Sequence, residues 1–234
     1  MTALDAPPRP RPRTVYLAGG LILAAILLTG VLVAVSQHHD PTVTGAVDGR
    51  NAATLDLLSG VGAVTVRAAD LGDTLYRIQS PRTATAHDTG DRVEVRVDGG
   101  DASVTVELNR DVRWTLRFTA GSQSNTADLR GLRRLAGVEY VGGVSAIDLA
   151  LPGPSGTVPV RVDGGASTLR VHAPDEAAVR VRAGGGAGGV SIDGATHSGV
   201  TAGATYATGG WDAAADRFDV DAAGGISSIT LDRN

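Results

Sequence analysis

Short runs of alternating apolar and polar residues, each bounded by small residues, follow one another along most of the chain. In Val158–Val171 (VPVRVDGGASTLRV) valine occupies every second position, a glycine pair follows, and a second alternating run begins after three more residues. Period-two alternation places successive side chains on opposite faces of a β-strand. The segment therefore predicts two strands joined by a tight corner at Gly164 and Gly165.

The same unit of a small pair, three residues and an apolar–x–apolar strand recurs at a nearly fixed interval. Successive pairs are 21–22 residues apart, except for two steps of 39–40 residues. A period of about 20–50 residues indicates stacked repeats, because one unit cannot bury its apolar face alone. We predict an all-β fold, a single β-solenoid of about eight coils, in which corner glycines adopt φ > 0 or let neighbouring corners stack closely. The glycines of the regular corners are Gly60, Gly99, Gly100, Gly142, Gly143, Gly164, Gly165, Gly185, Gly186, Gly224 and Gly225, and a degenerate corner falls at Gly121 with Ser122.

Three stretches depart from this pattern. Leu75–Ala86 is expected to form a less regular coil, and Thr196–Asp216, rich in Gly, Ala and Thr, is expected to be irregular. The leucines of Asn125–Gly137 suit either a short helical turn or a folded loop. Because terminal repeats must cover the open end of the core, we expect Trp211 or Phe218 to do so.

The amino-terminal part predicts a membrane anchor. Val15–Val35 is an uncharged apolar run of 21 residues, and about 20 such residues cross the hydrocarbon core as a helix. Arginines precede the run, which places a disordered tail (1–14) in the cytoplasm and a linker (36–51) and the solenoid domain (52–234) outside the cell membrane. The alternative is a signal peptide cleaved near Ala34-Val35-Ser36. We favour an uncleaved single-pass anchor, because signal peptides usually have apolar regions of about 7–15 residues.

The composition limits which residues can form the core and which classes of partner are expected. Aromatic residues make up 3% of the chain, which suits a thin interior of Val, Leu, Ile and Ala. The chain has no cysteine, so disulfides and Cys-ligated metals are excluded. All 21 basic residues are arginine, and the part after the anchor holds 18 of them against 24 acidic residues. That acidic excess gives no support for nucleic acid as a partner.

Motifs for nucleotide or nucleophilic chemistry are weak. Gly184, Gly186 and Gly189 match G-x-G-x-x-G, but the next residues continue as a strand, whereas a dinucleotide site needs a helix there. A Walker loop requires lysine, which the chain lacks, and no G-x-S-x-G occurs. We interpret the glycines as a corner and predict no catalytic residue and no cofactor.

Metal chemistry is equally weakly indicated. His38-His39-Asp40 could ligate a metal, but adjacent residues seldom close a site alone, so a solvated linker is favoured. Alternation points His172 outward, as a surface residue. Calcium-binding β-rolls need tandem G-G-x-G-x-D-x-U-x repeats, which the sequence lacks. Aspartates are common in turns, and the corner-associated ones are Asp98, Asp163, Asp193 and Asp221.

One surface pattern is sharper. Charged residues recur three positions before the corners, and in stacked coils they would form a ladder on one outer face. The first interpretation is a solvated charged face, in which Glu139 offsets its neighbours. The second is an anion-binding stripe, because arginine forks match phosphate and carboxylate geometry. The arginines of this predicted ladder are Arg96, Arg117, Arg161, Arg180 and Arg182.

The order of these segments resembles a family of putative-adhesin domains of unknown function in bacterial envelope proteins, including the "toast-rack" β-solenoids. The resemblance covers about residues 50–234 and rests on VRVDGGASTLRV, AGGGAGGVSIDG and FDVDAAGGISSITLD. It implies a β-solenoid that is often tethered by a transmembrane segment, and in some members a place in envelope-stress systems. It brings no established catalytic residues.

Together these observations favour a non-enzymatic, membrane-anchored envelope module of the adhesin or scaffold class. The expected partners are the membrane and either another envelope membrane protein, a wall polymer or further copies of the chain. One alternative is the ectodomain of an envelope-stress sensing system. A third is a carbohydrate-active enzyme, because β-helices can hold paired carboxylates about 5–9 Å apart.

Overall fold

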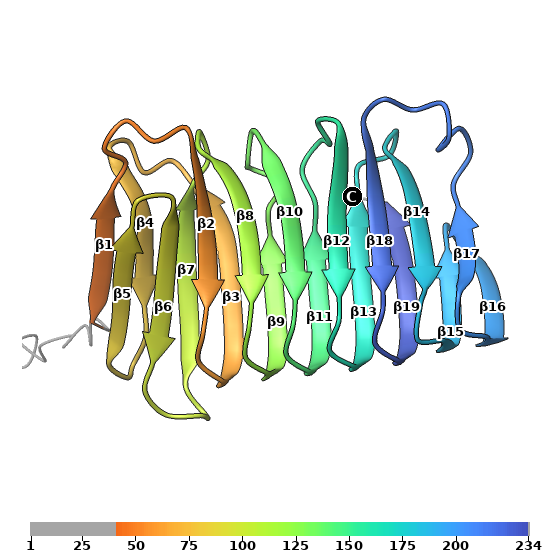
Figure 1. Cartoon of the computed structure of the whole chain (residues 1–234), viewed down its shortest axis with the longest axis horizontal. Coiled ribbons are helices and arrows are strands. Elements are labelled where there is room, and N and C mark those ends of the chain that lie inside the picture. Colours follow the sequence, from red (N-terminus) through yellow and green to blue (C-terminus); the bar gives the residue numbers. More distant parts are fainter. Residues whose placement is uncertain (1–40, 234) are drawn as a thin grey trace, which may run out of the picture. The chain divides into compact units, whose positions relative to one another are not determined.

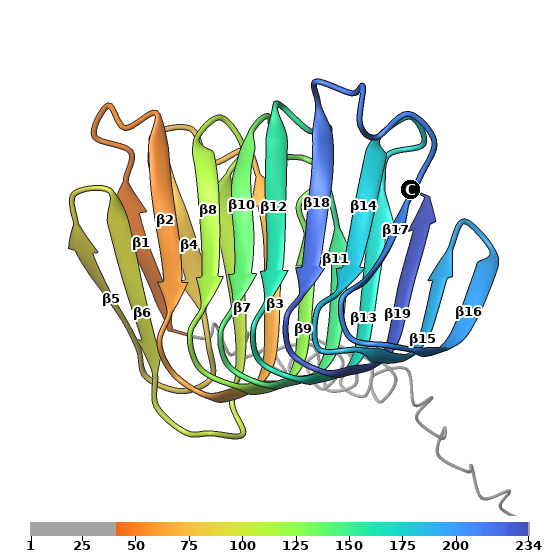
Figure 2. The same ribbon diagram turned by 45° about the vertical axis from the view of Figure 1, so that its right-hand side comes forward.

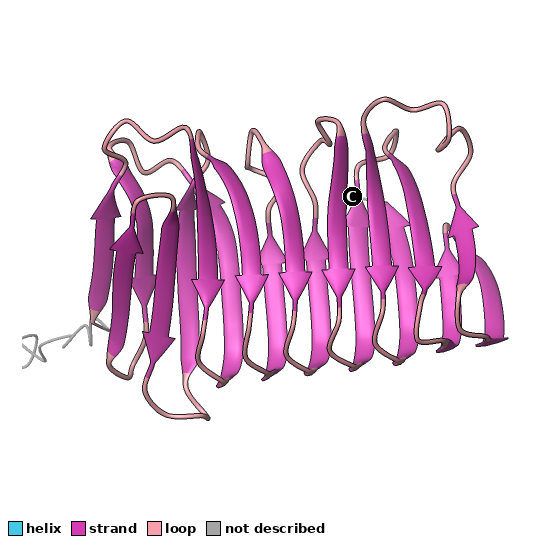
Figure 3. Cartoon of the chain, in the orientation of Figure 1, coloured by secondary structure: helices cyan, strands magenta, loops and turns pink. Residues whose placement is uncertain are grey.

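The computed structural model describes residues 41–233, which consist of strands, turns and loops without a helix (Figure 3). In this part of the chain no helix is long and apolar enough to cross a membrane. The predicted anchor Val15–Val35, the tail before it and His38-His39-Asp40 lie outside the described residues.

Nineteen strands of the described part form two sheets that face each other (Figures 1 and 2). The ten-stranded sheet contains, in spatial order, β1 (Thr42–Ala46), β4 (Thr74–Gln79), β7 (Ser103–Asn109), β3 (Val61–Ala69), β9 (Ser122–Asp128), β11 (Val144–Ala150), β13 (Ala166–Ala173), β19 (Ile226–Arg233), β15 (Ala187–Ile192) and β16 (Ala195–Val200). The nine-stranded sheet contains β5 (Ala84–Thr89), β6 (Arg92–Val97), β2 (Ala52–Leu57), β8 (Arg113–Phe118), β10 (Leu135–Tyr140), β12 (Thr157–Val162), β18 (Arg217–Ala222), β14 (Ala178–Ala183) and β17 (Ala204–Ala207).

Seven coils contribute one strand to each sheet: β2–β3, β6–β7, β8–β9, β10–β11, β12–β13, β14–β15 and β18–β19. Neighbouring coils pair in parallel and in register, so that Leu169 lies beside Ile147 on one side and Ile229 on the other. All three side chains are at most 1% exposed. The predicted all-β, repeat-like fold is confirmed, with seven coils in place of about eight.

The ends of the stack are covered by antiparallel strands. β4 and β5 pair with β7 and β6 at one end, and β16 and β17 pair with β15 and β14 at the other. The prediction of a coil at Leu75–Ala86 is therefore wrong, because this segment supplies most of β4 and the start of β5, which pair antiparallel with the neighbouring coil. Thr196–Asp216 supplies most of β16 and all of β17. The linker prediction is wrong from Thr42 onward, because β1 pairs with β4.

The spatial order of the coils differs from their order in the chain. The coil β2–β3 lies between β6–β7 and β8–β9, and the coil β18–β19 lies between β12–β13 and β14–β15. The strands that cover the ends of the stack also account for the two corner-to-corner steps of 39–40 residues. In each, two antiparallel strands at one end of the stack separate one coil from the next in the chain. After β4 and β5 the chain forms β6–β7, which lies between them and β2–β3; after β16 and β17 it forms β18–β19, which inserts between β12–β13 and β14–β15.

Close stacking explains the first glycine of four corners, Gly142, Gly164, Gly185 and Gly224. A Cβ on Gly142 would lie 2.5 Å from the amide nitrogen of Gly121, and one on Gly224 would lie 2.5 Å from the carbonyl oxygen of Gly164. Real Cβ atoms do not approach backbone this closely, so any larger residue would force two coils apart. Positive φ is found at only two of the predicted corner glycines, Gly99 and Gly186.

The degenerate corner lies one residue earlier than predicted. Ser122 pairs with Val144, so Asn125, not Thr126, takes the inward position beside Ile147. Asn125 is 1% exposed and accepts a hydrogen bond of 3.2 Å from the Tyr140 hydroxyl. Burial raises the pKa of Tyr140, which keeps this hydroxyl a donor. The core thus contains one internal polar pair that the alternation rule missed.

The segment after β9 is a folded loop, not a helical turn. Its leucines are all buried in the core: Leu129, Leu132 and Leu135. A hydrogen bond from Leu132 N to Leu129 O closes a tight turn between two of them. This outcome is the second of the two predicted alternatives.

The predicted end caps are wrong. Phe218 is fully buried inside the stack on β18, and Trp211 lies 3.8 Å from the guanidinium of Arg180 on the nine-stranded sheet. At the end formed by β16 and β17 the rings of His197 and Tyr206 stack, with centroids 4.4 Å apart. This pair bridges the two sheets and covers the core there.

Candidate functional site

The predicted ladder falls on the outward face of the nine-stranded sheet, where strand register creates one row of polar residues, here called the central row. The row crosses all nine strands: Thr205, Arg182, Asp221, Arg161, Glu139, Arg117, Asp56, Glu94 and His87. Three of the predicted arginines therefore share one row, each beside a carboxylate.

Ion pairs join the arginines of the central row to their neighbours. Arg117 Nη1 lies 2.9 Å from Glu139 Oε2, and Arg161 Nη1 lies 3.3 Å from Asp221 Oδ2. Arg182 Nη1 lies 3.9 Å from the same oxygen of Asp221. Opposite charges directly across strands favour the pairing of those strands, so the row supports the coil register.

Arg161 has a second partner, because its Nε lies 2.6 Å from Asp163 Oδ1 at the corner. The hydrogen bond and the charge of Asp163 raise the pKa of the Arg161 guanidinium, and the charges of Asp221 and Glu139 add to the effect. This cation is held by protein carboxylates on several sides.

The row contains one buried carboxylate, that of Asp56 on β2. The Asp56 side chain is 4% exposed, accepts a 2.6 Å hydrogen bond from the Thr119 hydroxyl, and lies 3.4 Å from Arg92 Nη1. Arg117 Nε is 4.0 Å away. Asp56 lies on β2 and Thr119 follows β8, so this contact depends on the insertion of the first coil into the stack.

The other two predicted arginines lie outside the central row. Arg96 lies opposite Thr85 and pairs with Glu94 at 3.6 Å. Arg180 forms a two-pronged pair with Asp219 at 2.6 and 2.9 Å, and this hydrogen bonding raises its pKa.

Trp211 completes the surroundings of Arg180. Its ring lies 3.8 Å from the guanidinium of Arg180 and 4.2 Å from that of Arg217, and its Nε1 donates a 2.9 Å hydrogen bond to the Phe218 carbonyl. These cation–π contacts fix the loop between β17 and β18 on the outer face.

Charge balance argues against a cationic stripe. The central row contains three arginines and four carboxylates, and each arginine has a carboxylate within 4.0 Å. The arrangement matches the predicted solvated charged face better than an anion-binding ladder.

The ten-stranded sheet has a polar hollow of about 370 Å³ above Ala150. Ala150 lies between Asp128 and His172 in the strand register, and the small side chain leaves the space open. His172 Nε2 is 3.3 Å from Asp148 Oδ1. Hydrogen bonds from Arg130 lower the pKa of Asp128, so this carboxylate is a paired anion and not a proton donor.

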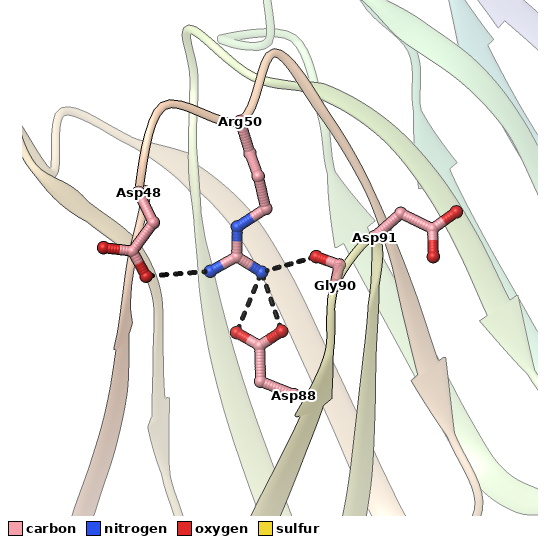
Figure 4. Close-up of a pocket in the computed structure, with 5 residues that line it drawn as sticks. All are labelled: Asp48, Arg50, Asp88, Gly90 and Asp91. Atoms are coloured by element: carbon pink, nitrogen blue, oxygen red, sulfur yellow. Dashed lines mark hydrogen bonds and ion pairs between the residues drawn. The ribbon is translucent and has the colours of Figure 1, made fainter.

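A second open pocket, of about 590 Å³, lies near the end formed by β1 and β5 (Figure 4). Arg50 is 16% exposed and occupies its centre, with Nη1 2.8 Å from both oxygens of Asp88 and 3.0 Å from the Gly90 carbonyl (Figure 4). Its Nε donates to the Val47 carbonyl at 3.0 Å, and Asp48 is 3.7 Å away. These bonds tie the β1–β2 turn to the β5–β6 turn.

No group of three or more His, Cys, Asp or Glu side chains suited to a metal occurs within residues 41–233. Of the G-x-G-x-x-G glycines, Gly184 and Gly186 form the corner that leads into β15, and Gly189 lies within that strand, where a dinucleotide site would need a helix. The corner aspartates are separate: Asp193 pairs with Arg233 at 2.7 Å, and Asp163 pairs with Arg161.

Sequence reasoning missed the Arg50–Asp88 clamp and the His197–Tyr206 stack. Both join segments outside the regular coils, where the 21–22-residue spacing gives no register. In the sequence the four residues stand alone in irregular stretches, and nothing there indicates that they meet in pairs.

Comparison with known proteins supports the fold. No family model matches the chain, and no curated protein is significantly similar in sequence. The structure is similar to that of a putative cell adhesion protein from Clostridium sporogenes ATCC 15579, with a TM-score of 0.62 and 16% identity over 83% of this chain and 98% of that chain. A putative adhesin from Bacteroides fragilis NCTC 9343 matches with a TM-score of 0.19 and 7% identity over 82% and 97% of the two chains, a score too low to support an argument.

Proposed function

We propose that the chain is a non-enzymatic envelope module of the adhesin or scaffold class, held at the cell membrane by Val15–Val35 with residues 41–233 outside the cell. The observation that carries the proposal is the pair of extended outer faces, on which parallel coils repeat side chains in register. Such faces suit binding to repetitive or extended partners. The likeness to a putative cell adhesion protein over 98% of that chain is in keeping with this role.

Photo-cross-linking of the full chain in its own cells tests the proposal. Amine-reactive reagents are unsuitable because the chain has no lysine. A photo-reactive residue is therefore placed at Arg170, exposed on the ten-stranded sheet, or at Arg182, exposed on the nine-stranded sheet. The control position is Val160, which is fully buried.

We expect wall polymer or cell-surface protein to be captured from an outward position and not from the buried one. Capture of one membrane protein in a fixed ratio would replace the proposal with the sensing alternative. Absence of any capture from both faces would reject a binding role for them. Release of reducing ends from wall glycan, abolished by His172→Ala, would favour an enzyme acting at the hollow above Ala150.

A further inference from the structure

The two sheets end level with each other at only one end of the coil stack. Beyond the coil β14–β15 each sheet has one more strand, β16 and β17, and these face each other through the His197–Tyr206 stack. At the opposite end β4 and β5 form such a pair, but β1 extends the ten-stranded sheet alone. The β16/β17 end is the flush end of the described domain (Figure 1).

The outer edges of β16 and β17 are open. Each strand is the last of its sheet in the described part of the chain and pairs on one side only, β16 with β15 and β17 with β14. The first five residues of β16 are exposed, and β17 alternates between half-buried and exposed positions. An exposed sheet edge is a template for pairing with another strand.

This end also lacks the usual protection of sheet edges. Native edge strands are commonly guarded by charged residues or proline. The sequences of β16 (ATHSGV) and β17 (ATYA) contain no Asp, Glu, Lys, Arg or Pro. At the opposite end the edge strand β1 (TVTGA) is also uncharged, but β5 carries Asp88, and the Arg50 clamp binds the turns beside both edge strands.

We propose that a second copy of this chain docks at the β16/β17 end, so that β16 pairs with β16 and β17 with β17 of the other copy, both antiparallel. A two-fold axis normal to the sheets maps each sheet onto its own continuation and reverses its strands, which gives both pairings at once. The flush end allows this. At the opposite end a β1–β1 pair would leave the two β5 strands three strand spacings apart, about 14 Å, too far to pair.

Gly199 limits where the pairing occurs. It has φ +62°, and the paired positions of β15 and β16 pass from Ser198 to Val200 without including it, although the register is the same on both sides. The regular part of β16 is therefore Ala195–Ser198, similar in length to β17. Docking also brings the two His197–Tyr206 stacks together and buries the end of each core. The inference goes beyond the proposed function, which does not depend on it.

Single cysteines test the proposal directly, because the chain has none. Thr196→Cys on β16 and Thr205→Cys on β17 place an exposed thiol on the flush end; Thr44→Cys on β1 and Thr85→Cys on β5 are matched exposed controls at the other end. Residues directly opposite in antiparallel strands have Cβ atoms about 4.5–5.5 Å apart, within reach of a disulfide. Ser198→Cys covers a second position of the axis along β16.

The assay is mild oxidation of the full chain in membranes, followed by non-reducing electrophoresis, with sedimentation of the detergent-solubilised chain as an independent measure of mass. We expect a dimer band at least five-fold stronger from a flush-end position than from either control. A Thr196→Lys/Thr205→Lys variant should reduce the dimer fraction at least five-fold, whereas Thr85→Lys should leave it unchanged. Equal bands from both ends, or a monomer up to 100 µM in sedimentation without flush-end cross-links, would overturn the proposal. A monomer that still captures partners through its outer faces would overturn only this inference and leave the proposed function standing.

Discussion

Adding a single methyl group at a stacked corner is the most direct test of how the coils are held together. In Gly142→Ala the new Cβ would lie 2.5 Å from the amide nitrogen of Gly121 and would overlap the Ala120 carbonyl group. Both contacts are with backbone atoms, which cannot move away by a change of side-chain rotamer. Relief therefore requires two coils to separate at the corner, where β9 and β11 are hydrogen-bonded.

The magnitude follows from this geometry. Overpacking in a rigid environment costs about 1–3 kcal/mol, and we expect about 2 kcal/mol for Gly142→Ala. In a domain of about 150–250 residues each kcal/mol lowers Tm by roughly 2–4 °C, so the expected decrease in Tm is about 4–8 °C. Urea unfolding followed by tryptophan fluorescence suits the measurement, because Trp114 and Trp211 are both buried.

The adjacent glycine is the control. A Cβ on Gly143 would lie 3.6 Å from the Gly165 carbonyl oxygen, an ordinary contact, and neither Gly142 nor Gly143 has a positive φ. Gly143→Ala should therefore be neutral, or more stable by up to about 0.5–1 kcal/mol because the unfolded chain loses freedom. If the two alanine variants unfold within 0.5 kcal/mol of each other, close corner stacking does not account for the glycines.

Three further variants test side-chain contacts. Glu107→Gln should cost about 1–2 kcal/mol of stability at neutral pH. Burial opposes ionisation of the Glu107 carboxyl, yet hydrogen bonds from two arginines lower its pKa below the usual value near 4.5, so its contribution to stability should disappear as the pH falls below about 4.5. In urea titrations the exposed Glu176→Gln variant should show no such pH-dependent loss. Tyr140→Phe should cost about 1–2 kcal/mol by leaving the buried Asn125 Oδ1 without a donor. Adding Asn125→Val should restore most of the loss in a double-mutant cycle, and additive losses would contradict the buried pair. Trp211→Ala should cost about 2–3 kcal/mol through lost cation–π contacts and packing, and a loss below 0.5 kcal/mol in thermal unfolding would show that the loop does not stabilise the domain.

The repeat could be predicted from sequence because each regular coil carries the same local rule. The alternation around Gly164 and the 21–22-residue spacing determine strands, corners and inward faces within a coil. At the degenerate corner the prediction was wrong by one residue. The small pair there is Ala120 with Gly121, not Gly121 with Ser122, so Asn125 faces the core although the pattern of glycine and serine pairs predicted it to face outward.

The order of the coils could not be predicted in this way. Asp56 and Arg117 become neighbours only because the coil β2–β3 inserts beside β8–β9. Their separation of about sixty residues carries no local signal, so the acidic partners of the predicted arginine ladder were only partly visible, as Glu139 and Asp221. The alternation of charges across the sheet is a property of the inserted order and not of any single coil.

That inserted order also changes how the protein can be built and taken apart. A simple solenoid can add or lose layers at its ends, one neighbour at a time. Here the last described coil in the sequence is an interior layer, so β14–β17 have no stack to join until β18 and β19 have been synthesised. Assembly during translation must wait for β18–β19 to insert between β12–β13 and β14–β15, and removing β18–β19 from the folded domain has to break the interfaces on both of its sides at once. Because of the two insertions, this stack of repeats should fold and unfold as one cooperative unit and not layer by layer.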